Sequence, residues 1–136
     1  MRFFIAAYLA ALTISTTSVS ALQNILIGTI EGCSSNKYGP DWYVWFADSP
    51  TCTTGVDLGP TSSMGGGLCG RDVTILGHSG IMFTGCSSKT GPPSGVSDNG
   101  GPALMCHPVS VANQKCPSPC GYSYPEVTVT TSYRCS

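Results

Sequence analysis

The sequence predicts an all-β fold: a small β-sandwich or barrel held together by disulfides, with a small α+β fold as the alternative. Short runs of β-branched and aromatic residues recur between turns rich in glycine and proline. Only residues 109–115 have a weak helical pattern. The chain also has 8 cysteines in 136 residues, a density typical of secreted domains whose disulfides supplement a modest core.

The first segment, Met1–Ala21, has the pattern of a secretory signal peptide. Arg2 precedes the apolar run FFIAAYLAALTI, and the small residues Val19 and Ala21 occupy the positions that signal peptidase favours. This run is shorter than a comfortable bilayer-spanning helix. We therefore expect cleavage after Ala21, secretion of the protein, and a single mature domain over residues 22–136.

Strand patterns follow in order along this domain. Residues 22–32 are rich in β-branched side chains, and residues 41–47 (DWYVWFA) place aromatic side chains on both alternating faces. Residues 73–76 and 81–84 flank the sequence GHSG, which is the strongest hairpin signal in the chain. We expect all of these segments to be strands.

The C-terminal part of the domain is predicted to end in a half-buried strand. Residues 103–111 are expected to be extended, and residues 126–135 (EVTVTTSYRC) alternate between apolar and polar positions. The predicted buried face contains Val127, Val129, Thr131, Tyr133 and Cys135. Residues 48–70 and 87–101 are rich in serine, glycine and proline, so we predict that they form long loops.

The cysteines predict four disulfides and no free thiol. They are Cys33, Cys52, Cys69, Cys86, Cys106, Cys116, Cys120 and Cys135. An even number of cysteines behind a secretory signal is typical of an oxidised domain, but the spacing does not select a pairing. Cys106, His107, Cys116 and Cys120 also have spacing compatible with a zinc site. The secretory signal favours disulfides over zinc, so we predict no metal and no cofactor.

Two short motifs are similar to hydrolase motifs but lack essential residues. SDNGGPALMC, residues 97–106, is similar to the nucleophile region of chymotrypsin-like serine proteases, but Asn99 stands at the position of the serine. We predict a turn at residues 98–101 instead, because these residues tolerate positive φ. The sequence GHSGI lacks the final glycine of the G-x-S-x-G nucleophile elbow. We therefore expect no enzymatic activity.

Four residues are candidates for binding a partner. If one face of residues 41–47 is exposed, Trp42, Tyr43 and Trp45 would stack on sugar rings or anchor a protein; burial of both faces is the alternative. His78 is the fourth candidate, at the tip of the predicted hairpin. A net charge of −1 without a basic cluster gives no support for nucleic-acid or membrane binding.

The whole chain resembles the small secreted cysteine-rich proteins of fungi, in particular the effector type of plant pathogens. The resemblance rests on the signal segment, the eight cysteines, the sparse charge, the Ser/Thr/Gly-rich loops and the ending Tyr133-Arg134-Cys135. It implies a virulence protein that binds a host protein and suppresses plant defence. The expected compartment is the apoplast or host interface, with the host cytoplasm as the alternative. Other candidate functions are binding of cell-wall carbohydrate, and protease inhibition through residues 87–101.

Overall fold

The computed structural model of the chain describes residues 21–31, 39–62, 65–118 and 126–136, and these residues form an all-β fold. The strands are β1 (Ile25–Glu31), β2 (Asp41–Phe46), β3 (Val56–Pro60), β4 (Asp72–Ile75), β5 (His78–Thr84), β6 (Gly95–Asp98), β7 (Gly101–Pro117) and β8 (Glu126–Cys135). The helical turn α1 (Thr51–Thr54) is the one helix among them. The predicted fold class is confirmed. Most of the predicted signal segment, together with Cys33 and Cys120, lies outside the described residues.

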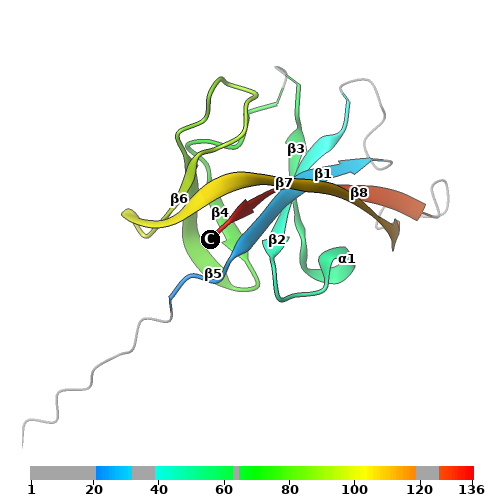
Figure 1. The fold of residues 1–136 in the computed structure, drawn as a ribbon, viewed down its shortest axis with the longest axis horizontal. Coiled ribbons are helices and arrows are strands. Elements are labelled where there is room, and N and C mark those ends of the chain that lie inside the picture. Colours follow the sequence, from blue (N-terminus) through cyan, green and yellow to red (C-terminus); the bar gives the residue numbers. More distant parts are fainter. Residues whose placement is uncertain (1–20, 32–38, 63–64, 119–125) are drawn as a thin grey trace, which may run out of the picture.

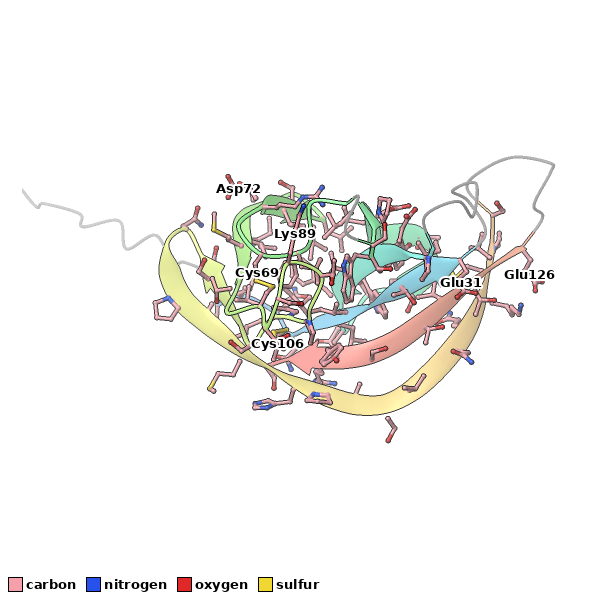
Figure 2. The ribbon with its side chains drawn as sticks, turned by 90° about the horizontal axis from the view of Figure 1, so that it is seen from above. Glu31, Cys69, Asp72, Lys89, Cys106 and Glu126 are labelled. Carbon is pink, nitrogen blue, oxygen red and sulfur yellow. A yellow bond between two sulfur atoms is a disulfide. The ribbon has the colours of Figure 1, made fainter. Side chains whose placement is uncertain are left out.

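The strands form one antiparallel sheet in the order β3-β2-β1-β8-β7-β6-β5-β4. The two halves of β7 have different neighbours: residues 101–105 pair with β6, and residues 106–117 pair with β8. Leu58 of β3 and Val73 of β4, from opposite ends of this order, pack in the same core. The sheet therefore curls back on itself into a near-closed barrel, and β7 follows a long arc around one side of it (Figure 2).

Two apolar clusters stabilise the barrel. They cover the two faces of β2, and all residues of β2 are therefore buried. The inner cluster fills the barrel; its buried residues are Ile25, Ile27, Trp42, Val44, Phe46, Leu58, Leu68, Val73, Ile75, Ile81, Phe83, Val96, Cys106 and Cys135. The outer cluster lies on the other face of β1, β2 and β8; its buried residues are Ile30, Tyr43, Trp45, Cys116, Val127 and Val129. Period-two alternation along the strands assigns neighbouring side chains to the two clusters.

The last strand, β8, is confirmed, but its predicted buried face is wrong. Val127 and Val129 lie in the outer cluster. Cys135 lies in the inner cluster, and Tyr133 packs against it. The alternate residues from Val127 to Cys135, Thr131 included, therefore do not share one face of the sheet.

A register shift between β1 and β8 explains this difference. Ile27 is opposite Tyr133, whereas its neighbour Gly28 is opposite Thr131, so Ser132 is an extra residue in β8. A β-bulge of this kind moves the side chains that follow it to the opposite face of the sheet. Figure 1 shows β8 running beside β7. Along β8, the buried side chains pass from the outer cluster at Val127 and Val129 to the inner cluster at Cys135.

Three local predictions need correction. Residues 109–115 are not helical but belong to β7, where they pair with β8. The predicted loop at residues 48–70 contains α1 and β3, and the predicted loop at residues 87–101 contains β6. These short strands carry little local signal, because glycine and polar residues are poor strand formers and their pairing depends on neighbouring strands.

The six cysteines in the described residues form three disulfides, and none of them is free. The pairs are Cys52–Cys116, Cys69–Cys86 and Cys106–Cys135. The sulfurs of Cys106 and Cys116 are therefore not available as zinc ligands. The structure describes no helix that is long and apolar enough to span a membrane.

Candidate functional site

The aromatic strand β2 offers no exposed face to a partner. The relative exposures of Trp42, Tyr43 and Trp45 are 7%, 6% and 1%. Trp42 packs in the inner cluster, whereas Tyr43 and Trp45 pack in the outer cluster with ring centroids 5.6 Å apart. The predicted alternation between two faces is confirmed, and both faces are covered. This corrects the hypothesis that these three rings form a surface for stacking on sugars.

The helical turn α1 supplies the cover over Tyr43. The Tyr43 hydroxyl donates a hydrogen bond to the carbonyl oxygen of Thr51 at 3.0 Å. A side chain on Gly55 would collide with the Tyr43 ring, so the chain that leaves α1 lies directly against the ring. The pKa of Tyr43 is raised, mainly by burial and to a smaller extent by the negative charge of Asp57. A hydrogen bond with the Gly55 backbone acts in the opposite direction.

Two tight turns lie at the same end of the sheet. Leu76 and Gly77 connect β4 to β5, Asn99 and Gly100 connect β6 to β7, and all four residues have positive φ. Positive φ at both central residues is typical of type I′ hairpin turns. The Asn99 N–H donates to the carbonyl oxygen of Gly80 in β5 at 2.9 Å, which links the second turn to the first hairpin. The predicted turn at residues 98–101 is confirmed, and we call this region the hairpin end.

His78 lies at the hairpin end, but it is the first residue of β5 and not the predicted tip of a loop. Its Nε2 is 2.9 Å from Oδ1 of Asp98, and both side chains are partly buried. The same Oδ1 accepts a hydrogen bond from the Asn99 side-chain amide at 2.9 Å. The ring of His78 also meets the ring of Phe46 edge-on, with centroids 6.3 Å apart. The GHSGI motif, which contains His78, and the SDNGGPALMC motif, which contains Asp98 and Asn99, are thus in contact.

This arrangement contains a histidine and a carboxylate without an adjacent nucleophile. In the described part of the chain, no serine or threonine hydroxyl is hydrogen-bonded to His78. Nucleophilic catalysis by a triad requires such a hydroxyl within hydrogen-bonding distance of the base. The contact between His78 and Asp98 connects the start of β5 to the end of β6.

A polar hollow of about 560 Å³ lies beside the hairpin end, on the outer face of β4, β5 and β6. It is lined by Asp72, Thr74, Ser79, Gly80, Met82, Ser97, Asn99 and Gly100. Asp72 pairs with Met82, which pairs with Ser97, so these three side chains form one row across the strands. The sequence pattern predicted strands at residues 73–76 and 81–84. It did not indicate the hollow, because only strand register brings its residues together.

The middle of β7 provides a second accessible surface. Residues 107–115 are exposed except for the partly buried Val109. The exposures of Met105 and Val111, at 64% and 69%, are among the largest of the apolar side chains in the described residues. One edge of this segment pairs with β8, and its other edge pairs with no strand among the described residues. Exposed apolar side chains beside an unpaired strand edge are typical of protein-binding surfaces.

No protein-family model matches the chain, and neither the curated proteins nor the solved structures contain a significant match to it.

Proposed function

We propose that the protein is a secreted, non-enzymatic binding protein of the effector type, which binds a host protein and suppresses plant defence. The observation that carries the binding role is the exposed surface of β7. The three disulfides support an extracellular setting, because such bonds persist where thiols stay oxidised. The part of the proposal that concerns plant defence rests on the resemblance to fungal effectors.

The chemistry of β7 suits an extended protein segment as a partner. A partner strand would pair with the backbone N–H and C=O groups at the open edge, while its side chains would contact Val111 and Met105. Pro108 lacks an N–H, and the register shifts between Pro108 and Ala112. A proline interrupts the row of backbone donors along a strand, which discourages indiscriminate pairing with other copies of the chain.

The structure gives less support to the other two candidate functions. Carbohydrate binding through Trp42 and Trp45 has no exposed rings to use. Protease inhibition through residues 87–101 would need a long exposed loop, but Gly95–Asp98 is a strand that lies between β5 and β7. Binding of a host protein through β7 is therefore the function that we favour.

Affinity purification from host extracellular fluid, followed by mass spectrometry, tests the proposal. The native protein should recover a host protein, and Val111→Glu should lose it because a carboxylate replaces an apolar contact. Leu76→Glu is the matched control, because Leu76 is also exposed but lies at the hairpin end. The same variants should be scored for suppression of defence, both with and without residues 1–21. Equal recovery by both variants, or recovery of polysaccharide alone, would contradict the proposal.

A further inference from the structure

We propose that the polar hollow on β4, β5 and β6 is a second binding site, and that its ligand is a neutral carbohydrate of one or two sugar rings. This inference does not depend on the proposed role of β7. Figure 2 shows Asp72, which lines the hollow, on the opposite side of the molecule from the arc of β7. A ligand in the hollow would therefore leave the β7 surface accessible.

Gly80 lines the hollow, and its lack of a side chain makes room for the side chain of Asn99 beside it. Gly80 has φ of +79°, a conformation that favours glycine. A Cβ at this position would collide with Oδ1 of Asn99, so the amide of Asn99 lies close over the Gly80 backbone. The residues around Gly80 include the short side chains Thr74, Ser79 and Ser97, and the space between the longer ones stays open.

The chemistry of the lining selects a ligand rich in hydroxyl groups. Asp72, Thr74 and Ser79 line the hollow, and their side chains make no hydrogen bond to another described residue, so their side-chain oxygens can bind a ligand. Hydroxyl and carboxylate groups both accept hydrogen bonds from sugar hydroxyls, and the serine and threonine hydroxyls also donate them. The side chain of Met82 adds an apolar surface for the C–H groups of a sugar ring.

The charge of the lining argues against anionic ligands. None of the lining residues is basic, and Asp72 contributes a negative charge. A phosphate, sulfate or carboxylate would therefore lack the cationic partner that normally binds it. The volume of about 560 Å³ lies within the range of small-molecule sites. Because the hollow is open to solvent, we expect a mono- or disaccharide to bind weakly.

One side chain of this site is held in place before any ligand arrives. The Asn99 amide donates to Asp98, and the same Asp98 oxygen is bound by His78. The amide oxygen of Asn99 is thereby held over Gly80, and both residues line the hollow. His78 acts here as a positioning residue, through Asp98 and Asn99, and need not contact the ligand itself.

Titration of the ¹⁵N-labelled mature protein with cellobiose, laminaribiose and N,N′-diacetylchitobiose tests the inference by NMR. At least one of these sugars should shift the amide signals of residues 72–82 and 97–100. Thr74→Val removes one hydroxyl at an exposed strand position and should weaken binding about fivefold. Asn99→Gly is compatible with the positive φ of the turn and should weaken sugar binding by a similar factor. Thr84→Val is the matched control, since Thr84 is exposed on β5 outside the hollow, and it should bind as the native protein does.

Several outcomes would overturn the inference. Absence of shifts at tens of millimolar sugar, or shifts centred elsewhere, would exclude the hollow as a carbohydrate site. Equal affinities of Thr74→Val and Thr84→Val would do the same. If lysine methyl ester binds and Asp72→Asn abolishes this binding while no sugar binds, the ligand is a cation. Val111→Glu should leave the titration unchanged, which separates this site from the proposed function of β7.

Discussion

The guanidinium of Arg71 donates a hydrogen bond to the carbonyl oxygen of Leu58. Leu58 lies in β3 and Arg71 immediately precedes β4, and these are the first and last strands in the sheet order. The same nitrogen of Arg71 donates to the carbonyl oxygen of Gly67 at 3.3 Å. No ladder joins β3 to β4 in the described parts of the chain. A side chain therefore bridges the gap that backbone pairing leaves in the barrel.

We expect Arg71→Met to lower the free energy of unfolding by about 1–3 kcal/mol. Methionine retains much of the aliphatic stem but removes the charged donor, and hydrogen bonds to charged groups contribute at the upper end of the usual range. Arg134→Met is the matched control, because Arg134 is exposed and its guanidinium makes no hydrogen bond to another described residue. Urea denaturation measures both changes. Similar values for the two variants would show that Arg71 does not close the barrel.

The close approach of β1 and β8 at the bulge gives a second prediction. A Cβ at Gly28 would collide with the carbonyl oxygen of Thr130, which is backbone and cannot rotate away. We expect Gly28→Ala to destabilise the fold by about 2 kcal/mol or more, because the strands must separate to make room. Gly101→Ala, where a Cβ would have only an ordinary contact with Asp98, should cost less than about 1 kcal/mol. Equal melting temperatures would contradict this view of the bulge.

The third prediction concerns the oxidation state of the whole mature chain. Three disulfides are present in the described residues, and Cys33 and Cys120 are expected to form the fourth. The mass of the secreted protein should then be lower than that of its reduced form by one hydrogen atom for each of the 8 cysteines. Its N-terminal residue should be Leu22. A stoichiometric reaction with a thiol reagent under denaturing conditions would show instead that two cysteines remain unpaired.

Tyr43 provides a prediction for alkaline solution. Burial, together with the charge of Asp57, raises its pKa, so the folded protein holds the phenol proton more tightly than the unfolded chain does. The protonated phenol of Tyr43 should contribute fully to the free energy of unfolding below the unfolded pKa of about 10. This contribution should decline as the pH rises towards the folded pKa. Subtracting the ultraviolet titration of Tyr43→Phe from that of the native protein isolates this phenol. Asp57→Asn should lower its midpoint, and an unchanged midpoint would exclude a contribution from Asp57.

Local patterns in the sequence predict much of this fold, for identifiable physical reasons. The aromatic alternation in residues 41–47 reports the two faces of β2 because side chains alternate in any strand. Asn99-Gly100 predicts its turn because these residue types tolerate positive φ. The extra residue Ser132 is not visible in the same way. A bulge leaves the apolar alternation of the sequence intact while it exchanges the faces of the strand.

The candidate site depends on relationships that no local pattern contains. His78 and Asp98 are twenty positions apart, and the register of β5 against β6 brings them within 2.9 Å. The hollow likewise needs three strands in one register around Gly80. The open edge of β7 near Val111 also depends on the strand order, which no local pattern contains.

The position of β8 between β1 and β7 has a consequence for biosynthesis. During translation, β1 and β2 emerge early and can pair at once, but the other edge of β1 must wait for residues 126–135. Cys106 likewise emerges well before its partner Cys135, at a time when Cys69 and Cys86 are already in the oxidising lumen. Cys52 is unpaired at this stage as well, because its partner Cys116 follows Cys106. Incorrect early pairing among these thiols is therefore a hazard for the nascent chain. Efficient production should depend on disulfide isomerase activity, which lets Cys106 exchange until the last strand is inserted.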